Sequence, residues 1–459
     1  MKTENTKILV GVILLAMIIV TIPYLIRMWN GNPYIPNSEA YYNLRFLESH
    51  SESSYDGLTQ RHIPLNIINE ISVDAKYSLW GSKILLLLLG IASVVMSYLI
   101  LKNHNMGEKN IWAVLLFLVA SPIFTYTFMD YNVYSIMIFL NLSIAYLLMK
   151  EKIVLSTLIF IITPFIDIYG AIVSLIFMTV YIIANARSYK KYQIFFIIAA
   201  LSIVSAVIVN ALLGYSIFSI NPFSKSNIIT DIGADIGFSF SSFILSIIGL
   251  ILLWEKGWKN VMIYGSIILF IILAIFNNFL RIYLNFLLAI YAGFAFIHLS
   301  RRKWSISIIK RITILLIICS ILFTTLVYTT KLIKSEPNPD YVDALVFLKN
   351  QSFPREKILS SEQNGYLIQY YSSRSTFLDQ KTADYEKYNL IIFQNLSTSR
   401  NLDRTEALLK DNNIRYIFID QAFKEYLQEK DGLWFLIETS NKFKNIYKNT
   451  NVEVWMYTG

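Results

Sequence analysis

The stretch ILVGVILLAMIIVTIPYLI, residues 8 to 26, indicates which class of protein this chain forms. It contains no charged side chain, and as a helix it is long enough to span the hydrocarbon core of a bilayer. No small-residue cleavage site follows it. We therefore interpret it as an uncleaved first membrane helix and not as a signal peptide.

Apolar runs of this kind recur along most of the 459 residues. Hydrophobic residues make up 55% of the chain and charged residues 15%, whereas a soluble domain is about 45–50% apolar and about 25% charged. We predict a polytopic α-helical membrane protein with about 11 transmembrane helices, two of which meet in a tight turn at Pro164. The predicted spans are 8–27, 84–101, 111–129, 134–149, 153–166, 168–185, 194–214, 237–254, 261–277, 282–299 and 312–330. The single cysteine, Cys319, excludes a disulfide framework and a cysteine-based metal site.

The basic residues are distributed unequally between the two sides of these spans. If the N-terminus is cytoplasmic, the cytoplasmic segments hold Lys2, Lys7, Lys102, Lys109, Lys150, Lys152, Arg187, Lys190, Lys191, Lys256, Lys259, Arg301, Arg302, Lys303, Lys310 and Arg311. The short outer loops hold only Lys225 and Arg281. The positive-inside rule then predicts a multi-pass protein of the cell membrane with a cytoplasmic N-terminus and its C-terminal domain outside. We expect no nucleic-acid partner, because no basic, aromatic-rich face is present in the pattern.

Three parts of the chain are predicted to lie on the outer side: a long loop at 28–83, a loop at 215–236, and everything after the last span. We predict a transmembrane domain at 1–333 and a small soluble extracytoplasmic α/β domain at 334–459, joined by the turn-rich linker SEPNPD. In the second domain, DYVDALVFLKN and NGYLIQYY have helical spacing, KILS and NVEVWMY are strand-like, and TEALLKDNNIRYIFID indicates a helix, a turn and a strand.

Charged residues gather at the predicted outer face of the membrane. They are Glu39 in the first loop, Asp130 after the third span, Asp167 in a turn, Asp231 and Asp235 in the 215–236 loop, and Arg281 at the start of the tenth span. Charges at membrane depth cost several kcal/mol unless they are paired or functional. Carboxylates from three loops in one site would suit a hard cation such as Mg²⁺ or Mn²⁺, and an arginine beside them would suit a phosphate.

Each of these residues also has an ordinary structural interpretation. Glu39 is then a charge at a helix start, Asp130 and Asp167 cap the helices that follow them, and Asp231 or Asp235 is a solvated loop residue. Arg281 is then a helix-end side chain that extends to the membrane surface. No single residue decides between the two interpretations, and only the pattern across the loops favours the functional one.

The stretch SEAYYNLR, residues 38 to 45, resembles the first-loop motif of oligosaccharyltransferase catalytic subunits of the archaeal and bacterial type, which are family C (GT-C) membrane glycosyltransferases. Glu39, Tyr41, Tyr42, Asn43 and Arg45 fill the positions of that motif. The resemblance implies that Glu39 reaches the metal and the acceptor. We expect the two tyrosine rings to lie at the level of the lipid headgroups, where such rings are favoured.

Four further stretches are similar to motifs of the same family. FMDYNVYSIMIFL resembles its second acidic motif, with Asp130 in the first position and Asn132 in the second. FIDIYGAIVSLI resembles the family's turn before a span. NIITDIGADIGFSFSSFILSIIGLILL resembles its outer loop, and Asp231 falls where the family usually carries Glu. NNFLRIYLNFLLAIYAGFAF resembles the span whose arginine contacts the donor phosphate, which matches Arg281.

The tail departs from the family. Where the family carries a Trp-Trp-Asp-Tyr-Gly signature, this chain reads SSEQNG at residues 360 to 365. The tryptophans that read the acceptor's hydroxyl residue in the family are missing. This weighs against N-glycosylation of a standard sequon, but it does not exclude sugar transfer from a lipid phosphate.

The resemblance therefore implies a glycosyltransferase that moves a sugar or oligosaccharide from a polyprenyl-(pyro)phosphate-linked donor to a protein or glycan acceptor on the outer face. It implies Glu39 and Asp130 as catalytic residues, Glu39, Asp130 and Asp231 as ligands of Mg²⁺ or Mn²⁺, and Arg281 as the donor phosphate site. Residues expected to line the acceptor site are Tyr41, Tyr42, Asn43, Arg45, Asn132, Asp167, Asp235 and Glu362.

Two alternatives belong to other functional classes. A non-catalytic relative would keep the fold and bind a lipid-linked glycan or a partner enzyme, which Asn132 and the missing tryptophans favour. A lipid or solute transporter is disfavoured, because this chain concentrates its charges at one face and shows no internal repeat.

Overall fold

The computed structural model describes residues 2–38, 40, 41, 44, 78–185, 189–212, 228–232, 236–254, 258–380 and 387–459. The chain divides into two compact units. We call Met1–Ile26 with His62–Lys334 the membrane unit, and Arg27–Arg61 with Ser335–Gly459 the C-terminal unit. Five of the residues that the sequence singled out lie outside the described residues: Glu39, Tyr42, Asn43, Arg45 and Asp235.

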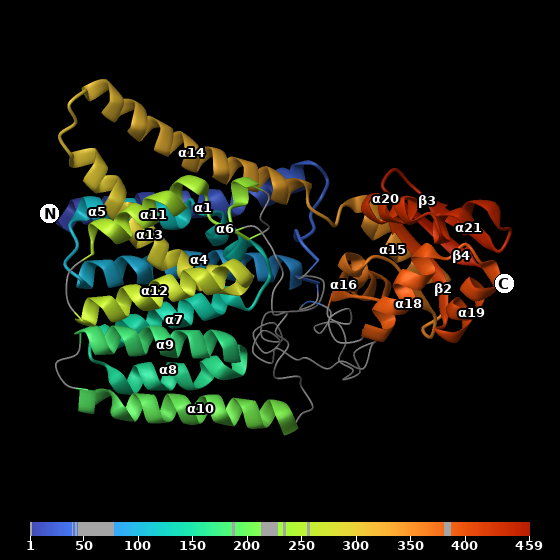
Figure 1. Ribbon diagram of the computed structural model, residues 1–459, viewed down its shortest axis with the longest axis horizontal. Coiled ribbons are helices and arrows are strands. Elements are labelled where there is room, and N and C mark those ends of the chain that lie inside the picture. The colour runs from blue at the N-terminus through green and yellow to red at the C-terminus, as the bar shows by residue number, and fades with distance from the viewer. Residues whose placement is uncertain are drawn as a thin grey trace. The chain divides into compact units, whose positions relative to one another are not determined.

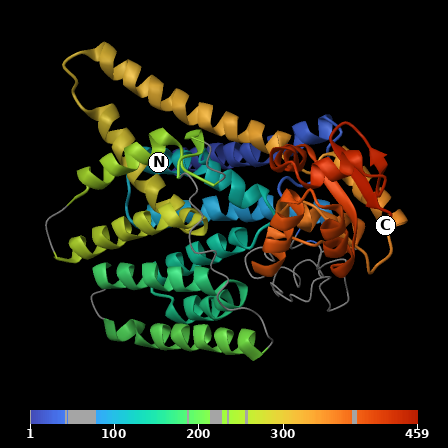
Figure 2. The ribbon, with the colours of Figure 1, turned by 45° about the vertical axis from the view of Figure 1, so that its right-hand side comes forward.

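The described part of the membrane unit is almost entirely helical. Its elements are α1 (Lys2–Trp29, which continues into the C-terminal unit), α4 (Ser78–Asn103), α5 (Glu108–Val119), α6 (Pro122–Met129), α7 (Tyr134–Met149), α8 (Ile153–Ile166), α9 (Ile168–Asn185), η2 (Tyr189–Tyr192), α10 (Gln193–Leu212), η3 (Thr230–Ile232), α11 (Phe240–Leu252), α12 (Trp258–Phe276), α13 (Asn278–Arg301) and α14 (Ser307–Lys334). Figures 1 and 2 show α4, α7, α8, α9, α10 and α12 side by side with nearly parallel axes.

Length and composition suit these helices to a membrane. Among the described residues, the helices α1, α4, α10, α13 and α14 are each long and apolar enough to cross a bilayer. The pair α5 and α6 passes the same test together, with a bend of 61° between its halves. The helices α7, α8, α9, α11 and α12 are shorter and equally apolar. The structure is therefore that of a mostly helical membrane protein, as the sequence predicts.

Two breaks between helices differ from the expectation. The expected span 111–129 is the bent pair α5 and α6, because Ser121 is extended (φ −71°, ψ 135°) and its Oγ accepts a hydrogen bond from the Ile123 N–H. Pro122 then starts α6 at a position where its missing N–H costs nothing. The expected turn at Pro164 is wrong, since Pro164 lies inside α8 and the break before α9 falls at Asp167.

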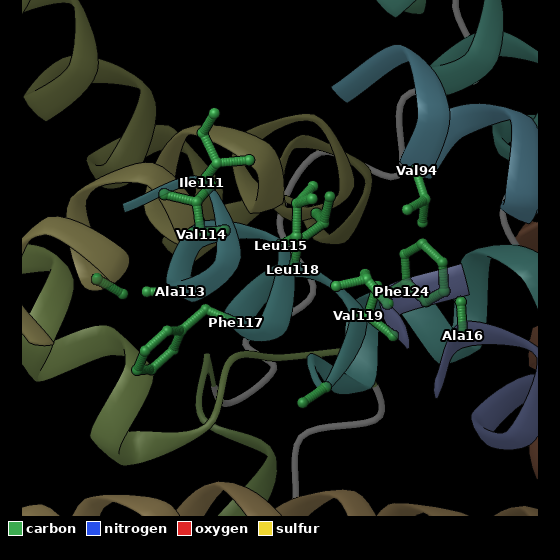
Figure 3. Packing of buried hydrophobic residues seen from close by; sticks show 14 of the residues in the cluster. Ala16, Val94, Ile111, Ala113, Val114, Leu115, Phe117, Leu118, Val119 and Phe124 are labelled. Carbon is green, nitrogen blue, oxygen red and sulfur yellow. The ribbon is translucent and has the colours of Figure 1, made fainter. Parts of the chain in front are cut away.

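The core of the membrane unit is centred on α5. Figure 3 shows Ile111, Val114 and Leu118 of this helix among their apolar neighbours, and all three are buried. Glycine allows the helices to approach closely here, because a Cβ added at Gly293 of α13 would lie 2.7 Å from the Val114 backbone nitrogen. At Gly249 of α11 an added Cβ would lie 2.0 Å from the Tyr291 carbonyl oxygen. Small residues at helix contacts are the usual device for close packing in membranes.

The C-terminal unit is a small α/β structure. Its further elements are α15 (Pro339–Gln351), β1 (Lys357–Leu359), η4 (Glu362–Asn364), α16 (Gly365–Leu367), η5 (Ile368–Ser372), α18 (Lys387–Thr398), α19 (Leu402–Asp411), β2 (Ile414–Asp420), α20 (Gln421–Lys430), α21 (Leu433–Thr439), β3 (Phe443–Lys448) and β4 (Val452–Tyr457). The strands form one sheet in the order β1-β2-β4-β3. β1 and β2 are parallel, and the other two pairs are antiparallel. The sheet buries Ile417, Ile419 and Tyr457 against the helices.

Candidate functional site

Asp130 ends α6 at the start of a buried connection to α7. Its side chain is 1% exposed, and its backbone N–H donates to the Tyr126 carbonyl at 3.1 Å. Asn132 stands where the second acidic residue was expected, and it is also buried. Its Oδ1 accepts a hydrogen bond from the Ser135 N–H at 3.2 Å, so this amide stabilises the first turn of α7.

A buried lysine that the sequence analysis missed lies near this connection. Lys83 of α4 is 7% exposed, and its Nζ lies 4.9 Å from the centre of the Tyr24 ring. The Tyr24 hydroxyl donates to the carbonyl of Met129, the residue before Asp130. In the sequence, Lys83 was only the last charge before the apolar run 84–101. Its partner is a residue of α1, which no local pattern reveals.

Asp231 connects three elements through its carboxylate. Its Oδ2 accepts a hydrogen bond from the Phe240 N–H at 2.7 Å, at the start of α11. Its Oδ1 accepts one from the Thr324 hydroxyl of α14, also at 2.7 Å. Asp231 is exposed, but it is not simply a solvated loop residue. Each oxygen uses one lone pair in these bonds and keeps acceptor capacity beyond them.

Arg281 is fully buried near the start of α13. Its Nε donates to the Ala274 carbonyl at 2.8 Å, and its Nη2 donates to the Ile275 carbonyl at 3.2 Å. These carbonyls end α12, where the helix dipole presents negative charge to a cation. Its Nη1 donates to the Ile236 carbonyl at 2.7 Å. A side chain that extends to the membrane surface would keep its charge in water, so the buried position argues against that interpretation.

The structure brings Asp231 and Arg281 to one short segment. Arg281 binds the carbonyl of Ile236, and Asp231 binds the N–H of Phe240, four residues further along the chain. The Thr230 N–H donates to the Phe238 carbonyl and the Phe238 N–H donates to the Ile228 carbonyl, which closes this segment onto the turn that carries Asp231. A carboxylate and a guanidinium from different parts of the sequence therefore both bind the backbone of the segment 236–240.

Asp167 has the geometry of a helix cap. Its Oδ1 accepts from the Tyr169 N–H at 3.1 Å and its Oδ2 accepts from the Gly170 N–H at 3.0 Å, which satisfies donors in the first turn of α9. The Tyr283 hydroxyl of α13 lies 3.4 Å from the same Oδ2. A Cβ added at Gly170 would lie 2.1 Å from this hydroxyl oxygen, so the position requires glycine.

Tyr41 is buried among other tyrosines of the C-terminal unit. It is 0% exposed, and its ring centre lies 5.2 Å from that of Tyr370 and 5.3 Å from that of Tyr371. Its hydroxyl donates to the Ile35 carbonyl and accepts from the Ile35 N–H, both at 3.1 Å. The Tyr371 hydroxyl donates to it at 3.2 Å. Burial raises the pKa of both phenols, so both donate as neutral groups.

Arg27 anchors the same segment, and the sequence analysis missed it. It is 1% exposed, and its Nη1 and Nη2 donate to the carbonyls of Ser335 and Pro337 at 2.7 and 2.9 Å. The Asn37 N–H donates to the Glu336 carbonyl at 3.0 Å. The chain that precedes position 39 is therefore held against the linker at 335–337. An arginine directly after an apolar run is common in membrane proteins and does not stand out in the sequence. Its partners at Ser335 and Pro337 lie about 300 residues away, so no local pattern indicates them.

The position of the missing tryptophan signature is a tight polar turn. Glu362 is exposed on it, whereas Asn364 is 1% exposed. The Asn364 Nδ2 donates to Ser360 Oγ at 3.1 Å and to Asp420 Oδ2 at 2.5 Å. A Cβ added at Gly365 would lie 2.3 Å from the Asp379 Cβ, which explains the glycine. The turn is rigid and presents polar rather than aromatic side chains.

The predicted metal ligands are described only in part. In the ranges that the structure describes, no three His, Cys, Asp or Glu side chains are grouped so that they could hold a metal ion. The predicted set contains Glu39, which lies outside those ranges. A site formed by Glu39, Asp130 and Asp231 therefore stays a prediction.

Comparison with known proteins relates the fold to membrane glycosyltransferases. No protein-family model matches the sequence, and no curated protein matches it. The oligosaccharyltransferase of Archaeoglobus fulgidus in its apo form matches with a TM-score of 0.65 at 12% identity, over 94% of this chain and 72% of that chain. The same organism's AglB, in complex with an inhibitory peptide and a dolichol-phosphate, matches with a TM-score of 0.65 at 11% identity, over 91% and 69%.

ArnT from Cupriavidus metallidurans bound to undecaprenyl phosphate also matches, with a TM-score of 0.59 at 10% identity, over 97% of each chain. At this level of identity, the likeness establishes the fold alone. The helical membrane architecture with a C-terminal sheet is therefore similar in fold to these membrane glycosyltransferases.

Proposed function

We propose that this protein transfers a sugar or oligosaccharide from a polyprenyl-phosphate- or pyrophosphate-linked donor to an acceptor on the outer face of the membrane. One observation supports this most directly. The chain shares its fold, over nine-tenths of its length or more, with an oligosaccharyltransferase in complex with a dolichol-phosphate and with ArnT bound to undecaprenyl phosphate. Both ligands are lipid phosphates, which is the chemistry that a lipid-linked donor presents.

In this proposal Arg281 binds the donor phosphate. A cation that is fully removed from water interacts more strongly with an anion than a solvated one does. The three carbonyls around Arg281 fix the plane of its guanidinium, and a guanidinium in a fixed plane is suited to two parallel hydrogen bonds with phosphate oxygens. Positive charge held there stabilises the negative charge that builds on the leaving phosphate.

Asp130 and Asp231, with Glu39, are the proposed ligands of Mg²⁺ or Mn²⁺. Carboxylate oxygens are the donors that these cations prefer. The burial of Asp130 and the remaining acceptor capacity of both Asp231 oxygens support these two residues as ligands, with the third to come from Glu39. When bound, the metal supplies electrostatic stabilisation of phosphate charge. Glu39 or Asp130 orients the acceptor or removes its proton.

The acceptor is proposed to differ from a standard sequon peptide. The turn at 361–365 carries a rigid polar surface in place of the two tryptophans, with Asn364 fixed by Asp420. A protein acceptor of other sequence or a glycan fits such a turn better than a sequon that is read by tryptophan rings.

A second candidate function is binding without catalysis. Asn132 supports it, because this amide stands in place of the second carboxylate of the family motif and accepts a hydrogen bond from the Ser135 N–H in the first turn of α7. In that case, the protein would bind the lipid-linked glycan or a partner enzyme, and would not turn the donor over.

The deciding experiment measures donor cleavage. The purified protein is incubated with polyprenyl-phosphate- and pyrophosphate-linked sugars and Mg²⁺ or Mn²⁺, and the released lipid phosphate is quantified. We expect release by the wild type, loss of release in Asp130→Asn, and no change in Glu151→Gln, which alters an exposed carboxylate in the turn between α7 and α8. Donor binding without release would instead establish the non-catalytic function.

A further inference from the structure

The C-terminal unit has a groove between the end of α21 and the strands β3 and β4. Its volume is about 340 Å³, and its lining residues are Ile437, Glu438, Thr439, Ser440, Asn441, Phe443, Lys444, Trp455 and Thr458. Ligand sites range over roughly 300–1,000 Å³, so the groove has the volume of a small one. Figure 1 shows α21 beside these two strands. None of the lining residues was singled out by the sequence.

Trp455 gives the groove an aromatic wall whose orientation is fixed. It lies on β4, opposite Asn445 of β3, and is partly exposed. Its indole N–H donates to Glu453 Oε2 at 3.1 Å. The carboxylate of Glu453 is itself held by Lys424 at 2.9 Å and by Lys448 at 3.1 Å. The indole N–H is thus already engaged, and the ring is set before any ligand arrives.

The floor of the groove is apolar and its walls are held by internal bonds. Ile437 and Phe443 are buried beneath it as members of the core of the C-terminal unit. The Thr458 hydroxyl donates to the Lys442 carbonyl at 2.9 Å, and the Thr439 hydroxyl donates to the Phe435 carbonyl at 2.7 Å. These bonds fix the backbone on both sides of the groove.

The rim offers three polar side chains. Glu438, Asn441 and Lys444 are exposed, and within the described part of the chain none of these side chains makes a hydrogen bond or ion pair. A carboxylate accepts hydrogen bonds, an ammonium donates them, and an amide does both. One negative and one positive charge face the groove, so its lining carries no net charge.

We propose that this groove binds an uncharged oligosaccharide. A sugar ring has an apolar C–H face, which packs on an aromatic ring, and an edge of hydroxyl groups, which both donate and accept hydrogen bonds. Trp455 supplies the ring, and Glu438, Asn441 and Lys444 supply partners for the edge. The balanced charge disfavours phosphates and nucleic acids. The proposal does not depend on sugar transfer, because it concerns a separate surface that lies entirely within the C-terminal unit.

The test is a direct binding measurement on the full-length protein in detergent. Mannotriose, maltotriose and chitotriose are titrated while saturation-transfer NMR follows the sugar protons. We expect saturable binding of at least one, weakened about tenfold in Trp455→Ala, because this variant removes the ring on which the sugar packs. Asn441→Ala should weaken binding too. Because it alters only an exposed side chain, it serves as the test if Trp455→Ala fails to fold.

The matched control is Tyr388→Ala, which removes an exposed aromatic ring from α18, outside the groove. It should bind like the wild type. The proposal is overturned if the wild type binds none of the three sugars, or if Asn441→Ala and a folded Trp455→Ala bind them unchanged. If no lipid phosphate is released but sugar binding depends on Trp455, the proposed transferase function is wrong and the proposed sugar site is supported.

Discussion

Arg281 has an observed structural role and a proposed role in donor binding. Its three nitrogens reach carbonyls at the end of α12 and in the segment before α11, so it holds two separate elements together. The same planar guanidinium is proposed to bind the phosphate of the lipid-linked sugar donor. Lysine carries its donors on one nitrogen at the end of a flexible stem and does not reproduce the fork.

Arg281→Lys is therefore expected to lower donor turnover by about tenfold or more, since a charge-assisted hydrogen bond contributes roughly 1.5–3 kcal/mol. The measurement is lipid phosphate release at equal protein levels, with the unfolding temperature recorded in parallel. Arg301→Lys, at the exposed far end of the same helix, is the control and should match the wild type. A loss of unfolding temperature with unchanged turnover would show that Arg281 is structural only.

Glu336 lies outside the membrane helices and has a shifted pKa. The residue is exposed, but desolvation of its carboxyl raises its pKa above the ordinary 4.5, the hydrogen bond from Tyr341 lowers it, and the charge of Asp420 raises it. The folded state thus favours the protonated carboxyl. The stability that this contributes is complete below about pH 4.5 and is lost as the pH rises through the folded pKa.

Glu336→Gln stays neutral at every pH. We expect the unfolding temperature of the wild type, relative to this variant, to be highest at acidic pH and to fall toward pH 7.5. Thermal unfolding at several pH values checks this, with Glu438→Gln, an exposed glutamate without partners among the described residues, as the control. Curves that run parallel for wild type and Glu336→Gln would contradict the expectation.

Single residues also mark where sequence reasoning succeeds and fails. Asp167 accepts hydrogen bonds from the N–H groups of Tyr169 and Gly170, which follow it by two and three residues. Its role as a helix cap could be predicted because both partners are this close in sequence. Tyr41 was placed at the headgroups, yet its partners are Tyr370 and Tyr371. Arg27 and Lys83 were missed for the same reason. A side chain whose partners are distant in sequence leaves no local pattern.

At the scale of elements, the apolar periodicity was a reliable guide to helices and a poor guide to their breaks. α7, α8 and α9 match the expected ranges, because lipid requires every backbone polar group to be bonded within a helix. Pro164 did not end α8, whereas the pair Ser121 and Pro122 did separate α5 from α6. In the C-terminal unit β1, β2 and β4 were expected from β-branched and aromatic residues, but the more polar edge strand β3 was not.

The contact between α11 and α13 gives a prediction at this scale. Gly249→Ala would place a Cβ 2.0 Å from the Tyr291 carbonyl oxygen, so the helices must move apart. Overpacking costs typically about 1–3 kcal/mol, and we expect a lower unfolding temperature in detergent. Gly265→Ala in α12 meets nothing within 4 Å and is the matched control. Equal unfolding temperatures for the two variants would show that this contact is looser than described.

At the scale of the whole molecule, the fold was predictable and the chemistry only partly so. Hydropathy and the first-loop motif led to the membrane glycosyltransferase fold, which likeness to solved structures supports along nearly the whole chain. Asp231 and Arg281 meet at one segment, which no spacing in the sequence required. The groove at Trp455 escaped prediction because its lining comes from a helix end and two strands of ordinary composition.

Removal of metal tests the proposed site in the complete protein. EDTA should abolish lipid phosphate release, and Mg²⁺ or Mn²⁺ should restore it. Binding of Mn²⁺, followed by electron paramagnetic resonance, gives a readout that does not depend on turnover. We expect Asp130→Asn and Asp231→Asn each to weaken Mn²⁺ binding, and Asp167→Asn to leave it unchanged. Turnover that survives EDTA would rule out a metal role.

The contact between Arg27 and the carbonyls of Ser335 and Pro337 sets an order of events during biosynthesis. The donor and its first acceptor are 308 residues apart in the chain. Ribosomes add about 5–20 residues per second, so Arg27 waits roughly 15–60 s for its partners to be made. Throughout that interval Arg27 has its neighbours Asn32 and Tyr34 as acceptors, and the contacts with the linker at 335–337 form last. A nascent chain released before residue 335 would lack the carbonyls of Ser335 and Pro337 that complete the binding of this guanidinium.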